Sequence, residues 1–398
     1  MFVFTLAIVI LNLIPIIFPA SIVRLTSNFE DKTINPFELG WLAIPFVIID
    51  SILIGLMILG YKGKLPNIIS RFSNFIQDFD ISWKISLTII LILLSSYVVF
   101  VLSQQLFVEE SFFDYTMGVK KAANEWTPNV AGAFTGAFKV FLVHYSTVIF
   151  KNIRMIPFMA SLSLLILVYL TTLELTQKRI ASIIAVFLVI QSNNFLQFGT
   201  SSTYPNFWIL LYLLSIYLTL KKWYFSHVSY IFAVFSKGLI ALFLPMTLFF
   251  ISDAKIEKRK KIFTAIPYLI LGLAFVIEIQ ISGNQFYFSP TNAFNSERFW
   301  NAFNTLTFQL RHDELLIIGL LPLIVGLYIK SRKKIQYANS SMFFLGWILF
   351  SGSLLGGFTL YTLEPYRQIP LVVFFAIGVG VLFSNKLMNR SNDIPSHL

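Results

Sequence analysis

Long apolar runs follow one another from the first residues of the chain to about residue 385. Polar or basic segments separate them. Each run is near the length that crosses about 30 Å of hydrocarbon as a helix. The pattern predicts twelve transmembrane helices, over residues 3–20, 41–60, 85–106, 155–175, 180–197, 205–220, 224–236, 238–252, 263–281, 315–330, 341–360 and 368–385. The short pair at 224–252 fits one bent hairpin or two half-spanning helices. We therefore expect an all-α polytopic membrane protein.

Basic residues are unevenly distributed around these spans. With the N-terminus in the cytosol, the inner segments hold 19 of the 30 Lys and Arg residues and six acidic residues. The outer segments hold 11 basic and 12 acidic residues. Because Lys and Arg concentrate in cytoplasmic loops, this distribution predicts cytosolic N- and C-termini. The net charge of +11 is then a topology signal whose partners are membrane lipids and not nucleic acid. The plasma membrane and the ER membrane both fit this prediction.

The composition excludes several kinds of chemistry. Charged residues make up 12% of the chain, about half of what a soluble domain carries. The absence of cysteine excludes disulfides, thiolate metal sites and cysteine nucleophiles. The four histidines are scattered, which disfavours a histidine-rich metal site. The first apolar run has no basic segment before it, so we expect a retained helix and not a signal peptide. Asp50, inside the second span, is interpreted as a polar contact of the bundle or as a functional group.

Two outer loops, about residues 107–154 and 282–314, hold almost all of the sequence outside the spans. Long loops in compact proteins are usually functional or disordered. Their many aromatic residues favour ordered structure at the membrane surface. The apolar stretch 131–150 is interrupted by Lys139 and His144, so we expect it to lie at the membrane interface.

A group of carboxylates opens the first outer loop. Glu109, Glu110 and Asp114 directly follow the apolar stretch that ends at Val108. Glu110 and Asp114 are four residues apart and would share one face of a helix. Neighbouring carboxylates at the mouth of a span are suited to general-base catalysis. The alternative is a solvated acidic loop that only follows the topology.

The order of these features resembles the integral-membrane C-type (GT-C) glycosyltransferases, in which an acidic motif opens the first long outer loop. Asp114-Tyr115 with Ala122-Ala123 is similar to the motif of polyprenol-dependent mannosyltransferases, and Glu109-Glu110 resembles that of protein O-mannosyltransferases. In the family the acidic motif follows the first helix, whereas here two further spans precede it. Residues 1–84 are therefore predicted to be an N-terminal two-helix addition with a cytosolic loop, and residues 85–398 a GT-C-like domain.

Further motifs of the family occur downstream, on the same predicted outer side. Tyr204-Pro-Asn-Phe-Trp208 resembles a polar and aromatic motif at the start of a helix. Phe235-Ser-Lys-Gly238, followed by Leu244-Pro245, is similar to an element between two short helices. Glu364-Pro-Tyr-Arg367 resembles a turn before a C-terminal helix. The resemblance implies that Lys237 and Arg367 bind the phosphate of the donor. Otherwise they are a snorkelling lysine and a helix-end anchor.

The resemblance implies an inverting transfer of a hexose such as mannose from a polyprenyl- or dolichyl-phosphate donor. The acceptor would be a hydroxyl of a glycan, lipid or protein on the non-cytosolic face. Asp114 is the first candidate for the base, before Glu110 and Glu109. A divalent metal such as Mg or Mn could offset the phosphate charge, although the sequence identifies no metal ligand. Contacts to the acceptor or the phosphate are also expected from Tyr204, Arg298, Arg311 and His312, of which the last three could equally form a solvated loop tip.

Three other functions remain open at the level of the sequence. Twelve spans fit a carrier or flippase for a lipid-linked or anionic solute, although no internal repeat is evident. A non-catalytic subunit of a membrane assembly could keep the same fold. Enzymes that resemble O-antigen polymerases have a similar number of spans, but they depend on arginines in a large outer loop, whereas here the carboxylates come first.

Overall fold

The computed structural model describes residues 1–21, 35, 37–125, 137–282, 294–310, 313–358 and 365–384. Within these ranges it contains helices and no β-strand, which confirms the all-α prediction. The helices of the first half are α1 (Phe2–Ile17), α3 (Ala43–Tyr61), α4 (Asn67–Asp78), α5 (Trp83–Gln104), η1 (Tyr115–Val119), α6 (Lys120–Asn124), α7 (Ala137–Phe150), α8 (Met155–Thr176), α9 (Arg179–Gln191) and α10 (Asn193–Phe198). The second half holds α11 (Phe207–Lys221), α12 (Trp223–Ser236), η2 (Gly238–Phe243), α13 (Leu244–Asp253), α14 (Lys258–Ser282), α15 (Ser296–Leu310), α16 (Glu314–Arg332), α17 (Ala338–Phe358), η3 (Pro365–Gln368) and α18 (Ile369–Leu382).

Every predicted span coincides with a helix or with two helices in succession. In the described part of the chain, six helical segments are both long and apolar enough to cross a membrane. They are Ala43–Tyr61, Trp83–Gln104, Met155–Thr176, Glu314–Arg332, Ala338–Phe358 and Pro365–Leu382. Several shorter apolar helices, α1, α9, α11 and the η2–α13 segment among them, lie at other predicted spans. Such a set of helices is typical of an integral membrane protein.

One predicted span is interrupted, and the break between two others lies where the sequence placed it. Residues 180–197 divide into α9 and α10 at Ser192, whose Oγ accepts a hydrogen bond from the Phe195 amide at 3.1 Å and so begins a new helix. Residues 224–252 form α12 and then η2 with α13, and the chain is extended at Lys237 between them. The two breaks thus bring the polar side chains of Ser192 and Lys237 between otherwise apolar helices.

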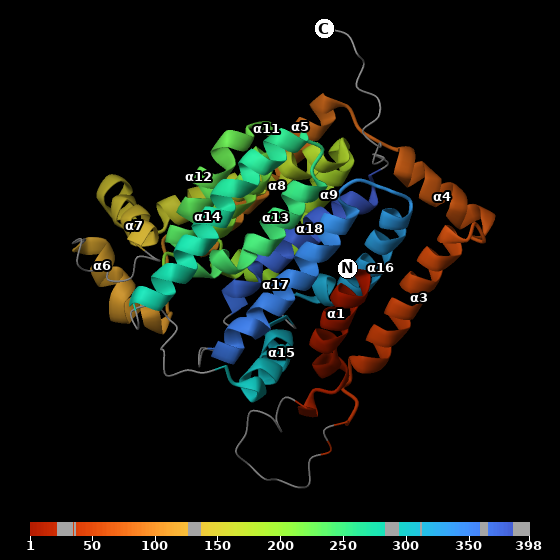
Figure 1. Cartoon of the computed structure of the whole chain (residues 1–398), viewed down its shortest axis with the longest axis horizontal. Coiled ribbons are helices and arrows are strands. Elements are labelled where there is room, and N and C mark those ends of the chain that lie inside the picture. The colour runs from red at the N-terminus through yellow and green to blue at the C-terminus, as the bar shows by residue number, and fades with distance from the viewer. Residues whose placement is uncertain are drawn as a thin grey trace.

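The core gathers around α18, which is buried along most of its length between α8, α9, α16 and α17. Figure 1 shows α3 and α4 on one flank of the molecule and α6 with α7 on the opposite flank. The first of these flanks holds the predicted two-helix addition: α1 packs against α15, α16 and α17, and α3 packs against α16.

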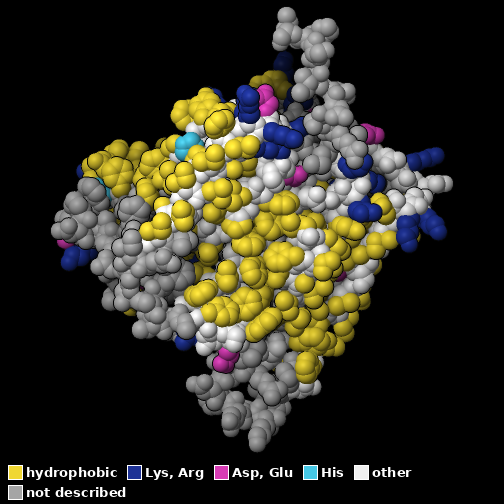
Figure 2. Space-filling model, in the orientation of Figure 1, with side chains coloured by type: hydrophobic (Ala, Val, Ile, Leu, Met, Phe, Trp, Pro, Cys, Tyr) yellow, Lys and Arg dark blue, Asp and Glu magenta, His cyan; other side chains and the backbone are white. Residues whose placement is uncertain are grey.

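The outer surface of the bundle is largely apolar. Many large apolar side chains of α3, α5 and α14 are exposed, for example Ile48, Leu91 and Ile270. Figure 2 shows a broad apolar face on the side of the molecule where α14 and α17 lie in front, with Lys and Arg gathered along its upper and right margins. An apolar face of this extent on the outside of a helical bundle is suited to contact with lipid.

The segments between the long helices fall into two groups, one basic and one not. We call the first group the basic end. It contains Lys178, Arg179, Lys221, Lys222, Lys255, Lys258 to Lys261, Lys330 and Arg332 to Lys334. The opposite end contains the segment after α5, the breaks at Ser192 and Lys237, and the start of α18. The predicted site residues that the structure describes all lie toward this second end.

Candidate active site

Glu110 anchors the first outer segment to the chain before α11. Its side chain is fully buried, and it accepts hydrogen bonds from the hydroxyls of Ser201, Ser202 and Thr203 at 3.0, 2.7 and 2.7 Å. The amides of Ser202 and Thr203 donate to the same carboxylate. Arg154 Nε lies 3.6 Å away from Oε1. A carboxylate enclosed by this many donors serves to hold structure, because its oxygens are already occupied.

This anchor fixes the position of Tyr204, the next residue along the chain. The Tyr204 amide donates to Ser201 Oγ at 2.9 Å, in the turn that Glu110 holds. Behind the turn, Gly199 packs so closely on Tyr97 that a side chain there would collide with the Tyr97 hydroxyl. The Gly199 carbonyl accepts a hydrogen bond from Ser161 Oγ. The turn before α11 is therefore built against rigid helices on two sides.

Asp114 lies exposed beside this turn and is joined to it through Tyr204. The Tyr204 hydroxyl donates a hydrogen bond to Asp114 Oδ2 at 2.8 Å. The Asp114 side chain, which carries the second carboxylate oxygen Oδ1, is exposed. Of the three carboxylates of the acidic motif, Asp114 thus combines accessibility with a defined orientation.

The Tyr204 ring connects Asp114 to the two cations predicted to bind phosphate. It stacks on Tyr366 at a centroid distance of 4.1 Å and an interplanar angle of 11°. Lys237 Nζ lies 3.7 Å from the centroid of the Tyr366 ring, a cation–π geometry. Arg367 Nε lies 3.3 Å from the Tyr366 hydroxyl, to which it donates. Because Tyr204 and Lys237 are both close to the ring centroid, they occupy opposite faces of Tyr366.

Other aromatic rings hold this stack in place. Phe112 meets Tyr204 edge-on at 5.3 Å, and Phe198 meets Tyr366 edge-on at 5.9 Å. Phe112 and Phe198 stack on one another at 5.4 Å. Trp208, at the start of α11, lies 4.9 Å from Lys237 Nζ. Rings that meet in offset or edge-on geometry restrain one another, so the tyrosine pair forms a firm wall beside Asp114.

Lys139, on α7, adds a further cation beside the acidic motif. Its Nζ donates to the Thr203 carbonyl at 3.3 Å, next to the turn that holds Tyr204. Burial lowers the pKa of the Lys139 ammonium, and the charges of Asp114 and Glu110 raise it in opposition. Lys139 therefore places positive charge beside the acidic motif, whereas Lys237 and Arg367 are connected to Asp114 through the Tyr204–Tyr366 stack.

Comparison with known proteins leaves the family open. No family model matches the chain, and no curated protein matches it. The candidate site is therefore defined by its own contacts, which bring together residues from the acidic motif and from three downstream motifs.

The other predicted site residues that the structure describes, Glu109 and Arg298, make contacts of their own. Glu109 is exposed and forms an ion pair with Lys120 at 2.5 Å. The Arg298 amide donates to Asn295 Oδ1 at 2.9 Å near the start of α15, a helix that contacts η3. Arg311 and His312 lie outside the described residues, as does Glu364.

The described part of the chain brings together no group of three or more His, Asp and Glu side chains that could hold a metal ion. The cluster offers Asp114 as its accessible carboxylate, with cations around it. Magnesium is usually held by one or two carboxylates together with phosphate oxygens and water, and the described residues of the cluster supply one carboxylate, so a divalent metal stays a prediction. We assign no step of the reaction to a metal.

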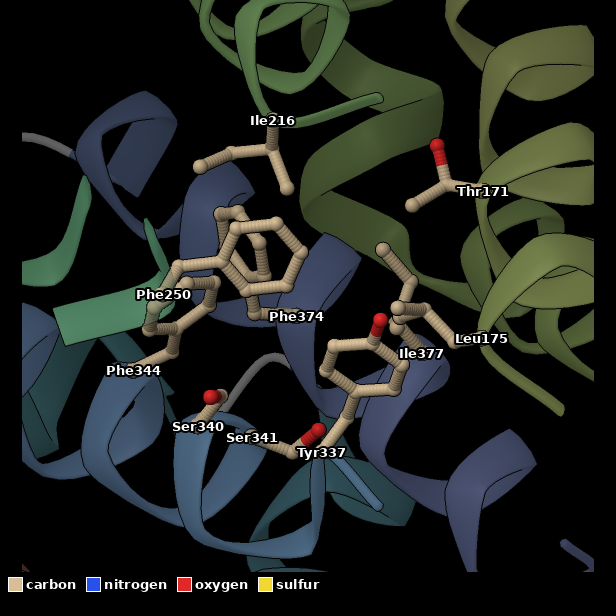
Figure 3. Close-up of a pocket in the computed structure, with 10 residues that line it drawn as sticks. All are labelled: Thr171, Leu175, Ile216, Phe250, Tyr337, Ser340, Ser341, Phe344, Phe374 and Ile377. Carbon is tan, nitrogen blue, oxygen red and sulfur yellow. The ribbon is translucent and has the colours of Figure 1, made fainter. Parts of the chain in front are cut away.

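A separate cavity lies deeper in the bundle, toward the basic end. Figure 3 shows it between α8, α11, α13, α17 and α18, with Thr171 and the ring of Tyr337 at its wall. Its volume of about 10 Å³ holds no more than one water molecule. It is too small for a sugar or a phosphate, so it does not compete with the cluster around Asp114.

Several residues of the site were not singled out from the sequence. Tyr366, which joins the cations to Tyr204, appeared there only as part of a motif. No motif in the sequence marks Arg154 or the hydroxyl-bearing residues 201–203 as part of a site. A run of four adjacent Ser and Thr residues, 200–203, between two apolar spans is itself a signal, because such hydroxyls need buried partners.

Proposed function

We propose that this protein is a membrane glycosyltransferase that moves a hexose from a polyprenyl-phosphate donor to an acceptor hydroxyl, with inversion. The observation that carries the proposal is the continuous path of contacts from Asp114 through Tyr204 and Tyr366 to Lys237 and Arg367. A base and two cations are what an acceptor hydroxyl and a departing phosphate require. Three motifs far apart in the chain supply them at one place, as in C-type glycosyltransferases.

Asp114 acts as the general base in this proposal. The bond from Tyr204 to Oδ2 orients the carboxylate and leaves Oδ1 to receive the acceptor proton. Glu110 is assigned a positioning role, since its oxygens already accept bonds from residues 201–203. Glu109 is assigned to the surface because of its exposed ion pair with Lys120.

Lys237 and Arg367 bind the donor phosphate. In the structure Lys237 lies on the face of Tyr366, an arrangement that contributes on the order of 0.5–2 kcal/mol. Arg367 Nη1 is buried without a hydrogen-bond partner among the described residues. A phosphate oxygen satisfies such a donor with a charge-assisted bond, which is stronger than a neutral one.

The reaction is a single displacement. The acceptor oxygen gives its proton to Asp114 and attacks the anomeric carbon of the sugar. The bond between that carbon and the phosphate oxygen breaks, and polyprenyl phosphate leaves with the electron pair. Lys237 and Arg367 stabilise the charge that develops on the leaving oxygen. The Tyr204 and Tyr366 rings form a wall against which the sugar can pack.

In this proposal the basic end faces the cytosol and the site faces the opposite compartment. The support is the gathering of Lys and Arg at one end of the helices, as cytoplasmic loops require. A site on the far side has no access to cytosolic nucleotide sugars, so it needs a donor carried by a lipid. Such a lipid would reach the site along the apolar outer surface of the bundle.

The direct test is sugar transfer by the purified protein in vesicles. We expect the wild type to move label from polyprenyl-phosphate mannose or polyprenyl-phosphate glucose to an acceptor within a panel of glycans, lipids and hydroxyl-bearing peptides. The inverted anomeric configuration of the product is read by NMR. Absence of transfer from both donors over the whole panel would contradict the proposal.

Substitution of Lys237 or Arg367 by Gln is expected to raise the KM for the donor. Each change removes a charge-assisted hydrogen bond, so we expect an increase of about 10–100-fold for each variant. The measurement is initial rate against donor concentration. Lys121→Gln is the matched control, because Lys121 is an exposed cation in the segment that carries Asp114. Equal effects of Lys121→Gln and Lys237→Gln would show that only the overall charge matters.

A lipid-linked-solute carrier is a second candidate function, which Asp50 favours. This carboxyl is buried in α3, and neither of its oxygens has a hydrogen-bond partner among the described residues. Buried ionisable groups inside membrane helices often serve ion or proton pathways. Uptake of a labelled lipid-linked sugar into vesicles, lost in Asp50→Asn but kept in Asp114→Asn, would favour this candidate.

A further inference from the structure

The basic end contains a group of lysines that the proposed reaction does not use. Lys178 lies in the turn between α8 and α9, Lys330 lies in the last turn of α16, and Lys333 follows that helix. Lys178 and Lys333 both act electrostatically on Lys330. The helices that carry them pack against α18, which ends at the same place. Cations from two separate segments thus lie within electrostatic reach of Lys330 at this end of the fold.

These lysines are incompletely paired. Lys178 Nζ is buried and has no hydrogen-bond partner among the described residues. Lys330 Nζ donates to the Ser384 carbonyl at 3.1 Å, which uses one of its three donors. Lys333 is exposed at the end of α16. A buried ammonium without an acceptor is costly, so an anion here would stabilise the folded protein.

The acidic residues described near these lysines, Glu174 and Asp80, already have other partners. Glu174, on the preceding turn of α8, forms an ion pair with Lys221 at 2.6 Å. Asp80 accepts hydrogen bonds from the amides of Arg179 and Ile180 at 2.9 and 3.1 Å, and so caps α9. Lys178 directly precedes these two amides, at the positive end of the α9 dipole. The local field therefore favours an additional anion.

We propose that Lys178, Lys330 and Lys333 form a binding site for a phosphate group at the basic end, separate from the donor site at the opposite end. Phosphate suits three ammonium groups because its oxygens accept several charge-assisted hydrogen bonds. The headgroup of an anionic phospholipid and a soluble phosphate share this chemistry. Exposed Lys333 marks the side from which either one enters.

The test measures binding through thermal stability of the full chain in a neutral detergent. Phosphatidylglycerol is compared with phosphatidylcholine, and inorganic phosphate is compared with chloride at equal ionic strength. We expect a rise in Tm with phosphatidylglycerol. In Lys178→Gln/Lys330→Gln/Lys333→Gln the midpoint of this effect should move to a concentration about 100-fold higher, since each lysine near an anionic headgroup contributes about fivefold in affinity. A rise with phosphatidylglycerol alone assigns the site to a lipid headgroup, and a rise with phosphate as well assigns it to phosphate groups in general.

The matched control is Lys222→Gln/Lys255→Gln/Lys258→Gln, which removes the same charge from exposed positions of the same end. Equal losses in the two triple variants would overturn the site in favour of overall charge. A wild type that responds to neither probe would overturn it as well. Should the first triple variant fail to fold, Lys178→Gln alone should weaken binding about fivefold, and an unchanged midpoint would refute the proposal.

Discussion

Replacing Asp114 by Asn is expected to slow sugar transfer about 10²–10⁴-fold, the usual contribution of a general base. Asn cannot take the acceptor proton, although its carbonyl oxygen can still accept the hydrogen bond from Tyr204. The site should therefore keep its shape, and the KM for the donor should change little because Lys237 and Arg367 are intact. The measurement is the rate of single-turnover transfer in vesicles.

Glu109→Gln is the control for this variant, because it removes a carboxylate of the same motif. Its exposed ion pair with Lys120 should contribute at most about 1 kcal/mol, so transfer should stay close to the wild-type rate. A large loss in Glu109→Gln together with normal transfer in Asp114→Asn would move the base to Glu109. Normal transfer in both variants would exclude the acidic motif as the source of the base.

Replacing Glu110 by Ala should instead destabilise the protein. The change leaves Arg154 without its buried carboxylate and the hydroxyls and amides of residues 201–203 without their acceptor. Removal of one partner of a buried ion pair costs about 3–5 kcal/mol. We expect a lower Tm and faster proteolysis in the outer segments, with transfer lost as a consequence. Glu110→Gln should be milder, because it keeps one acceptor oxygen and the shape of the side chain.

Two comparisons separate the roles of Glu110 and Asp114. Ser103→Ala removes an exposed hydroxyl near the end of α5 and should leave the Tm unchanged. Asp114→Asn should lose transfer with an unchanged Tm, whereas Glu110→Ala should lose both. If Glu110→Gln folds with the wild-type Tm and yet has no transfer, Glu110 takes part in the chemistry and the assignment of Asp114 is wrong.

The positions of the helices could be predicted from the sequence because apolar length determines them directly. The prediction of 155–175 corresponds to α8 at Met155–Thr176, and that of 315–330 to α16 at Glu314–Arg332. The break at Lys237 coincides with the boundary between the predicted spans 224–236 and 238–252. The break at Ser192, inside the predicted span 180–197, could not be predicted in the same way, because it depends on a single side chain that caps a helix.

The sequence also identified candidate site residues, namely Asp114, Tyr204, Lys237 and Arg367. It could not show that they are connected by contacts in the fold. Their proximity depends on Tyr366, whose ring is in contact with Tyr204 on one side and Lys237 on the other. Nor could spacing alone separate Glu110 from Asp114. The difference arises from the 201–203 turn, which buries one carboxylate and leaves the other accessible. Contacts between distant segments have no local signature in a single sequence.

The hydrogen bonds between Glu110 and residues 201–203 also determine when the site can form during synthesis of the chain. The ribosome adds Glu110 well before its partners, so the carboxylate must remain in water until α10 has entered the membrane. Tyr366 and Arg367 follow only shortly before the last helix, α18. A prematurely released chain that ends before η3 therefore carries Asp114 and Lys237 without the ring that aligns them. The cluster around Tyr366 can therefore form only when synthesis is almost complete.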